Sequence, residues 1–460
     1  MPNLQDSEDQ YWKFIPQKSA DAKNKIAKSL SPVTTKRHDL TDDSRSNGKL
    51  QGRQSVAQAK AVQDTPKGSS LDFFIATILR GYVPGRDVAA SINETTPRIC
   101  GAWAEVLPDL VKNDANAVLV AAIEAFALAI LVGGPAPAVI DKSTAVEAYG
   151  SALRSVNDAL QTYGSSSATE TIAAVMCLLF AELFLPTSLE SWTAHLEGLG
   201  QLIQTSQPQD YAAGIPHRLF VGARPALIVL GIQSRTPCFL AREEWRGFPF
   251  RDITPSPVQA LMSEAAIIPS ILNKIDKTND MCPESAKVQA SGGALIDLLA
   301  LMERLESWAT RFLSLSKAAP FWLKATGGKC GRGCIWFESL TAANGLTHFW
   351  AFKVICLTNI ERLAASHPEV MMNIRISETS VFDETKKLST MLCQSIEYLM
   401  QDNMKLFGPT SVVLPLQTAY ETFRAGGVQT KDEFDWCRDV LKHVFGGYHF
   451  LTLFFDEFRQ

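Results

Sequence analysis

Two cysteines with three residues between them, Cys330 and Cys334, are the nearest approach in this sequence to half of a metal site. Thiolates at so short a separation can bind Zn²⁺, and His348 is a distant candidate for a third ligand. A tetrahedral site needs a fourth ligand, and the sequence offers none at a diagnostic spacing. The surrounding glycines fit a loop between helices, so we favour a loop and predict no metal and no cofactor.

His195 is the most conspicuous candidate for acid–base chemistry, because it lies on an apolar helical face between Trp192 and Leu199. A general acid or base needs a carboxylate or a nucleophile within hydrogen-bond reach. The sequence places neither at a diagnostic spacing. We therefore interpret His195 as a buried, hydrogen-bonded part of the fold, and we predict no catalytic residue.

Buried charges offer a second kind of site. Glu124 and Glu182 lie inside apolar helical stretches, where an unpaired carboxylate costs free energy, and Arg224 and Arg235 are candidate partners. The structural interpretation is a buried Arg–Glu pair, and the functional alternative is the polar floor of a small-ligand cavity. The weak candidates for ligand binding are Glu182, His195, Arg224, Arg235 and Trp245.

The motifs of several common enzyme classes are missing from the chain. There is no Gly-x-Ser-x-Gly turn, no His-Glu-x-x-His pair and no dinucleotide-binding glycine pattern. The Gly-Gly-Lys run at residues 327–329 lacks the Ser or Thr that follows lysine in a phosphate-binding loop. The sequence therefore predicts a protein that is not an enzyme.

The elements that must position these residues have helical periodicity. Apolar residues recur three and four positions apart over 168–184, Pro186 ends that stretch, and a second apolar face runs over 192–203. This pattern predicts an antiparallel helical hairpin. Further helices are expected at residues 71–81, 98–107, 115–132, 143–163, 219–231, 257–272, 291–315, 336–366, 378–404 and 431–455.

Composition and periodicity together predict an all-α fold. Alternating strand patterns are nearly absent, and proline and glycine separate the helical stretches along the chain. Residues 1–70 are polar, with too few aliphatic side chains to form a core, so we expect a disordered tail there. One large helical domain is expected over residues 71–460.

Charge and hydropathy restrict the cellular setting. The net charge is −4 over 460 residues, whereas a domain that binds DNA by itself is usually basic. Residues 1–10 lack the apolar core of a secretory signal. The longest apolar run, 118–132, contains Glu124 and is shorter than the roughly 20 residues that span a bilayer. We expect an intracellular chain with no membrane partner and no autonomous DNA binding.

The hairpin also carries a family resemblance. Trp192, His195 and Gly198, each separated by two residues and followed by an aliphatic run, resemble the centre of the fungal-specific transcription factor domain. In many fungal regulators this large helical region follows a two-zinc, six-cysteine DNA-binding cluster. The flanking chain also fits, from about residue 71 to the C-terminus, especially over 217–250 and 415–444. The resemblance implies an all-α fold in which His195 belongs to the fold signature.

The resemblance and the cysteine pattern lead to a functional expectation. The family's zinc cluster needs six cysteines ahead of the helical region, but the first cysteine of this chain is Cys100. We expect a nuclear or cytoplasmic transcriptional regulator that acts through protein partners, such as a complete zinc-cluster relative, with a small effector as a further candidate ligand. By association its targets include a secondary-metabolite gene cluster. The alternative is an enzyme or a hydrophobic-metabolite-binding protein that has reused the helical scaffold in a biosynthetic pathway.

Overall fold

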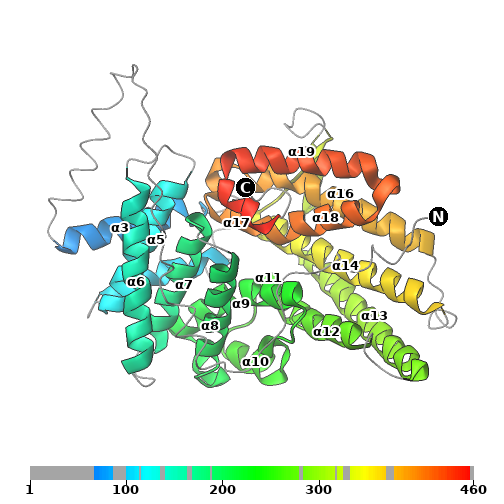
Figure 1. The fold of residues 1–460 in the computed structure, drawn as a ribbon, viewed down its shortest axis with the longest axis horizontal. Coiled ribbons are helices and arrows are strands. Elements are labelled where there is room, and N and C mark those ends of the chain that lie inside the picture. The colour runs from blue at the N-terminus through cyan, green and yellow to red at the C-terminus, as the bar shows by residue number, and fades with distance from the viewer. Residues whose placement is uncertain are drawn as a thin grey trace, which may run out of the picture. The chain divides into compact units, whose positions relative to one another are not determined.

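The computed structural model describes residues 67–85, 100–112, 116–134, 140–162, 168–186, 189–278, 283–315, 319–324, 332–368 and 378–455. These stretches are helical apart from turns, loops and one two-stranded sheet, which confirms the all-α fold class (Figure 1). The tail predicted over residues 1–70 lies outside the described residues as far as residue 66. Cys330 of the candidate metal half-site also lies outside them.

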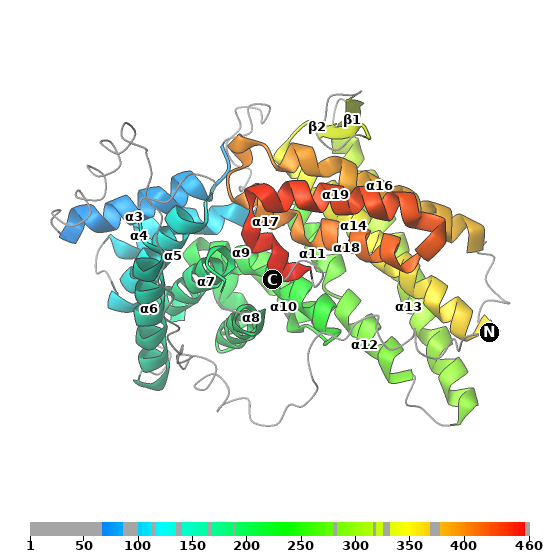
Figure 2. The same ribbon diagram turned by 45° about the horizontal axis from the view of Figure 1, so that its top comes forward.

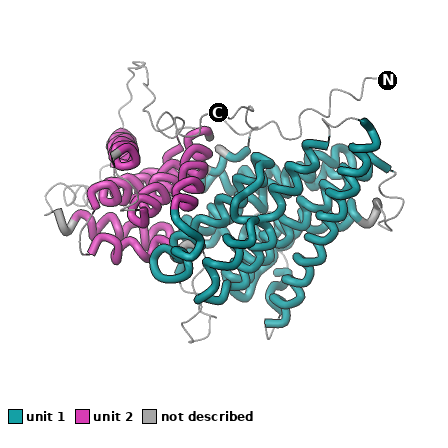
Figure 3. The backbone as a smooth tube through the Cα atoms, turned by 90° about the horizontal axis from the view of Figure 1, so that it is seen from below, with its two compact units in different colours: residues 1–18, 84–102, 206–460 teal, residues 19–83, 103–205 magenta. Residues whose placement is uncertain are grey.

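The chain divides into two compact units (Figure 3). Unit 1 comprises residues 1–18, 84–102 and 206–460, and unit 2 comprises residues 19–83 and 103–205. The sequence predicts one helical domain over residues 71–460. The division into two compact units does not test that prediction.

Unit 2 is built around helix α5. Its helices are α3 (Lys67–Gly81), α4 (Leu107–Val111), α5 (Ala117–Gly133), α6 (Lys142–Thr162), α7 (Ala168–Phe184) and α8 (Leu189–Ile203), and the 3₁₀ helix η3 (Cys100–Val106) precedes α4. Helices α3, α6 and α7 all pack against α5, whose sequence is apolar almost throughout. The Asn116 side chain accepts a hydrogen bond from the Val118 amide at 2.9 Å, so it caps the start of α5.

Stacked aromatic rings fill the core of unit 2. Trp103 is almost fully buried, and its ring centroid lies 5.2 Å from that of Phe180 and 6.1 Å from that of Phe126. Tyr82 packs on Phe180 with centroids 4.9 Å apart, and Phe184 stacks on Phe126 at 6.1 Å. This cluster connects the segment after α3 with η3, α5 and α7.

Helices α7 and α8 pack against each other, as the apolar periodicity of 168–203 predicts. Leu196, Leu199 and Ile203 of α8 are fully buried. Trp192 is only partly buried, although it belongs to the apolar face that the sequence indicates. Burial on α8 is therefore complete at these smaller aliphatic side chains and only partial at Trp192.

Unit 1 is larger and is centred on α14, which packs against α11, α13, α16 and α18 (Figure 2). Its α-helices are α9 (Gly214–Ser234), α10 (Glu243–Gly247), α11 (Pro257–Ala265), α12 (Ile268–Thr278), α13 (Glu284–Leu315), α14 (Leu340–Ser366), α16 (Glu378–Leu399), α17 (Phe407–Ser411), α18 (Val413–Ala425) and α19 (Lys431–Gly447). Its 3₁₀ helices are η4 (Pro208–Tyr211), η5 (Phe239–Ala241), η6 (Phe248–Phe250), η7 (Asp402–Met404), η8 (Gly427–Thr430) and η9 (His449–Phe454).

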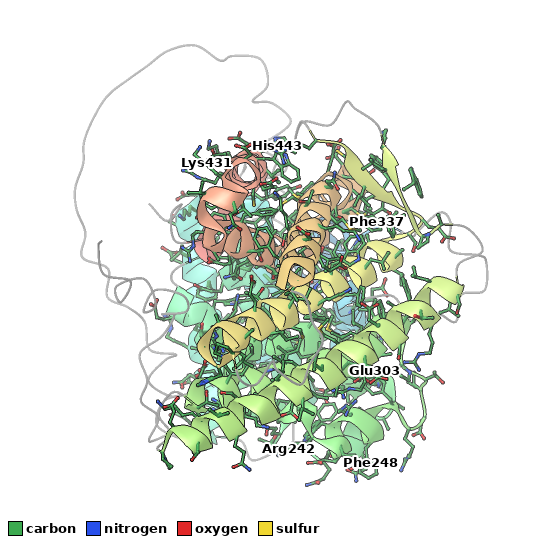
Figure 4. The ribbon with its side chains drawn as sticks, turned by 90° about the vertical axis from the view of Figure 1, so that its right-hand side faces the viewer. Arg242, Phe248, Glu303, Phe337, Lys431 and His443 are labelled. Carbon is green, nitrogen blue, oxygen red and sulfur yellow. The ribbon has the colours of Figure 1, made fainter. Side chains whose placement is uncertain are left out.

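A short antiparallel hairpin departs from the expected helix over residues 336–366. Strand β1 (Phe321–Lys324) pairs with β2 (Cys334–Phe337), with Trp322 opposite Trp336. Each strand has two aromatic side chains, and β2 also has the β-branched Ile335, residue types that favour extended structure. Phe337 of β2 is labelled in Figure 4. The helix itself begins only at Leu340, where the Ser339 hydroxyl accepts a hydrogen bond from the Ala342 amide at 3.1 Å.

The single helix expected over residues 257–272 is two helices, α11 and α12. Pro269 lies in the first turn of α12, where its missing N–H leaves no hydrogen bond unmade. Ala266 and Ile267 form the break between the two helices. Proline is favourable in the first turn of a helix, so Pro269 indicates the start of α12. Apolar periodicity does not show this start.

Helix α9 is longer than its predicted range of 219–231 and contains Pro225. Its length and composition alone would suffice to cross a membrane, but half of its most apolar window is buried against the rest of the protein. A helix in the core of a protein passes the same test of length and composition, and it shows similar burial. The helix ends at Arg235, whose φ of 51° lies in the left-handed region.

Candidate functional site

The candidate His195 belongs to a buried polar cluster in unit 2. Its ring nitrogen Nε2 lies 2.7 Å from the hydroxyl oxygen of Tyr149 on α6. The Tyr149 hydroxyl also hydrogen-bonds the carboxyl group of Glu182 on α7. His195 and Tyr149 are each 6% exposed, and Glu182 is fully buried. Three helices therefore contribute one polar group each to a common point inside an apolar core.

Burial governs the protonation of this cluster. In the bond between Tyr149 and His195, either the tyrosine hydroxyl or the Nε2–H donates, depending on the tautomer of the ring. Burial lowers the pKa of His195 to about 4, so the ring is neutral at physiological pH. Burial first, and then the nearby Glu182, raise the pKa of Tyr149 far above its usual value.

This chemistry favours a structural role for the cluster. A general base at neutral pH works best with a pKa near 7, and burial moves His195 well below that value. Cys177 lies on α7, and burial raises the pKa of its thiol, which makes the thiolate form scarce. The polar groups of Tyr149, His195 and Glu182 bind one another, so they hold α6, α7 and α8 in register.

The candidate Arg224 is fully buried in unit 1 and binds residues of α11. Its Nη1 donates to the Gln259 carbonyl at 3.1 Å and to the Gln259 side-chain oxygen at 2.6 Å, and its Nη2 donates to the Ser263 hydroxyl at 2.8 Å. The Gln259 amide in turn donates to the Val221 carbonyl on α9 at 3.1 Å. Arg224 therefore fastens α9 to α11 through neutral acceptors.

Aromatic rings surround the same arginine. The guanidinium carbon lies 4.8 Å from the ring centroid of Phe250 and 5.7 Å from that of Phe220. The candidate Trp245 belongs to this aromatic cluster, with its ring 5.8 Å from Phe220 and 4.9 Å from Phe239. Trp245 is buried, so within unit 1 it is a core side chain beside the arginine.

The buried charges have partners within their own units that the sequence does not indicate, and the suggested Arg–Glu pairing stays a prediction. Arg235 donates from Nε to the Asp276 carboxylate and from Nη2 to the Leu272 carbonyl at 3.3 Å. Asp276 also accepts from Arg362 at 3.4 Å. Glu182 binds Tyr149, and burial raises the pKa of Glu124. The sequence shows which helices carry these charges, but it does not show which neighbours face them.

The metal half-site is described only in part. The Cys334 thiol is buried and donates to a Glu397 carboxyl oxygen at 3.0 Å. His348 donates from Nδ1 to the Asn344 carbonyl at 2.9 Å, and burial lowers its pKa to about 4. Within the residues that the structure describes, no group of three or more metal-binding side chains gathers. A Cys330–Cys334 metal site is untested, because Cys330 lies outside those residues.

Sequence reasoning missed three of the residues that complete these clusters. Tyr149, Gln259 and Ser263 all lie on predicted helices, but the partners of each lie roughly 30 to 50 positions away in the chain. The available signal is a polar side chain on an otherwise apolar helical face, which marks a buried hydrogen bond without identifying its partner.

Comparison with known proteins gives one result. No curated protein and no solved structure matches the chain. A family model described as "Fungal specific transcription factor domain" matches residues 86–230, a range that includes Tyr149, Glu182 and His195. Residues 86–230 of this chain therefore belong to the fungal specific transcription factor domain family.

Proposed function

We propose that this protein is a nuclear transcription regulator that reaches its target promoters through a DNA-binding protein partner. The family match over residues 86–230 carries the proposal, since it indicates a transcription regulator. Nuclear location follows from the same family and is part of the proposal.

The use of the candidate residues supports a regulator over an enzyme. His195 binds Tyr149, Arg224 binds Gln259 and Ser263, and Arg235 binds Asp276. Each of these bonds connects two helices of one unit, which is what a structural residue does. A catalytic residue would instead direct its polar atom towards a substrate.

The need for a partner is supported by charge. The chain carries a net charge of −4 over its 460 residues. A protein that binds DNA by itself depends strongly on lysine and arginine contacts to the phosphates, and a negative net charge opposes such contacts. We infer that sequence recognition is supplied by a second protein, with a complete zinc-cluster transcription factor as the expected type.

An exposed apolar surface on unit 1 supports contact with such a partner. Trp322 is 48% exposed and Leu323 is 63% exposed on β1, one on each face of the strand, and we name these two residues the β1 patch. Leu313 and Leu315, at the end of α13, are also exposed. Large apolar side chains in an exposed strand are a common feature of surfaces that protein partners cover. We propose that the DNA-binding partner covers the β1 patch.

Genetic complementation tests this proposal. In a strain that lacks the gene, we expect the transcripts of a defined set of genes to change, and the wild-type chain to restore them. The double variant Trp322→Ser, Leu323→Ser should restore them poorly at equal protein abundance. The matched control is Val428→Ser, because Val428 is an apolar residue with 92% exposure on η8.

Three outcomes would count against the proposal. One is a deletion strain with unchanged transcripts. Another is full complementation by the double variant, which would remove the β1 patch from partner binding. The third is turnover of a metabolite by the purified wild-type chain, which would favour the biosynthetic alternative. Regulation of the protein by a small effector stays a prediction. Its regulation of a secondary-metabolite gene cluster also stays a prediction.

A further inference from the structure

Two buried cysteines of unit 1 lie in direct contact. Cys393 is on α16 and Cys437 is on α19, and their sulfur atoms are 3.6 Å apart. Cys393 is 1% exposed and Cys437 is fully buried. The two residues are 44 positions apart in the sequence, so the contact connects two separate helices.

An ion pair supports the same helix contact. The Lys386 ammonium group on α16 lies 3.1 Å from the Glu433 carboxylate on α19. Lys386 lies about two helical turns before Cys393, and Glu433 lies about one turn before Cys437. The ion pair and the thiol pair therefore both join α16 to α19, and the two sulfur atoms are in van der Waals contact.

We propose that Cys393 and Cys437 form a reversible disulfide that cross-links α16 to α19. A disulfide needs a sulfur–sulfur distance of about 2.05 Å, so the sulfur atoms must approach by about 1.6 Å. This approach requires rotation of one or both side chains about their Cα–Cβ bonds. The proposal rests on this geometry alone and is independent of the proposed function.

The chemistry balances with a hydroperoxide as the oxidant. One thiolate attacks the peroxide oxygen, forms a sulfenic acid and releases an alcohol, or water when the oxidant is hydrogen peroxide. The second thiol attacks the sulfenic sulfur, and a water molecule leaves as the disulfide bond forms. The two thiols together lose two electrons and two protons, and the hydroperoxide gains them. A small dithiol reverses the reaction by exchange.

Burial makes the reaction depend on local opening of α19. Neither sulfur atom is accessible in the closed structure, so the oxidant must enter when α19 separates briefly from α16. Glu433→Gln removes the charge that holds Lys386 and should open this contact more often. We therefore expect the disulfide to form faster in Glu433→Gln than in the wild-type chain.

The disulfide should stabilise unit 1. A cross-link between residues 393 and 437 constrains the unfolded chain by closing a loop of this length. For a unit of this size we expect the unfolding temperature to rise by about 5 °C or more. Reduction should return it to the starting value.

Peptide mapping of the full chain tests the proposal. The native protein is treated with hydrogen peroxide, its remaining thiols are alkylated, and its non-reduced peptides are identified by mass spectrometry. We expect a cross-linked peptide that contains Cys393 and Cys437, that is lost on reduction, and that appears together with the higher unfolding temperature. Cys437→Ser should abolish it, whereas Cys356→Ser should retain it, because Cys356 is another buried thiol on a different helix, α14.

Two results would overturn the proposal. One is that hydrogen peroxide produces no cross-link in the native wild-type chain or in native Glu433→Gln, and that the cross-link forms only after denaturant is added. The other is that Cys393 or Cys437 pairs with a different cysteine, or is oxidised to the sulfinic acid without pairing. Because the wild-type chain and Glu433→Gln both keep the two thiols, neither result depends on whether a cysteine variant folds.

Discussion

The imidazole of His195 and the hydroxyl of Tyr149 are joined by a hydrogen bond of 2.7 Å inside unit 2. This bond connects α8 to α6 across 46 residues of sequence, and Glu182 of α7 completes the cluster. The histidine of the Trp-x-x-His-x-x-Gly pattern is thus a fixed point between three helices. Its neutral, buried state follows from the apolar residues around it.

Removing the hydroxyl at the centre of this cluster should destabilise the protein. Tyr149→Phe leaves Nε2 of His195 and the Glu182 carboxyl group without their shared partner, at a cost of about 1–3 kcal/mol in unfolding free energy. Denaturant unfolding measures the loss. Ser155→Ala on the same helix is the control, since it removes an exposed hydrogen bond, and it should stay within about 0.5 kcal/mol. Equal stability of Tyr149→Phe and the wild type would contradict the assigned role.

Two of the buried histidines, His195 and His348, should make stability fall in acid. Burial lowers the pKa of His195 and of His348 to about 4, against an ordinary value of 6.5. Between pH 6.5 and 4 the unfolded chain binds protons that the folded chain does not, so the unfolding free energy decreases as the pH falls. Each histidine accounts for up to about 3 kcal/mol of this loss. Above pH 6.5 both states are neutral, and the effect vanishes.

Comparison of the wild type with two variants isolates this effect from the titration of carboxyl groups. His195→Gln and His348→Gln keep a side-chain donor but cannot take up a proton in this range. Denaturant unfolding at pH 7 and at pH 4.5 should show a smaller difference for each variant than for the wild type. Parallel curves for all three proteins would mean that these histidines are protonated in the folded state.

Two glycines of unit 2 should respond to alanine in opposite directions. A Cβ atom added at Gly133 would lie 2.3 Å from the Phe184 carbonyl oxygen, so Gly133→Ala should cost about 1–3 kcal/mol through overpacking of α5 on α7. A Cβ added at Gly198 meets nothing within 4 Å, and the residue lies inside α8. Gly198→Ala should therefore stabilise the helix by up to about 1 kcal/mol. Thermal unfolding compares them, and a destabilised Gly198→Ala would show that this glycine has a further role.

The fork of hydrogen bonds from Arg224 should not survive replacement by lysine. A lysine ammonium group cannot donate in the planar geometry that reaches Gln259 and Ser263 together, so Arg224→Lys should cost about 3 kcal/mol or more. Arg242, labelled in Figure 4, is exposed, and Arg242→Lys is the matched control. Calorimetry of the two variants gives the comparison. Equal unfolding temperatures would show that the buried guanidinium geometry is dispensable.

Much of the helical fold could be predicted, because each long helix buries a regular apolar face. The pair α7 and α8 is an example, since its apolar residues recur at helical spacing over 168–203. Strand β2 could not be predicted in the same way, because its four residues are too few to distinguish one period from another. The break between α11 and α12 was missed for a related reason, as the apolar pattern continues across it.

The candidate sites could be predicted only as single residues. The sequence indicates that Glu182, His195 and Arg224 are buried polar groups, and all three are buried. Their partners depend on how helices pack, and local periodicity contains no information about that. The suggested Arg–Glu pairing therefore stays a prediction, whereas the contacts with Tyr149, Gln259 and Ser263 had no counterpart in the sequence.

The central claim is that the protein reaches promoters through a DNA-binding partner. The most direct test compares its promoter occupancy in cells with DNA binding by the purified chain. Chromatin immunoprecipitation of the tagged full chain should show enrichment at particular promoters. The purified chain alone should show no sequence-specific binding to DNA fragments from those promoters, at low or at physiological salt. Occupancy in cells without specific binding in isolation is the predicted result. Absence of promoter enrichment, or tight specific binding by the isolated chain, would contradict it.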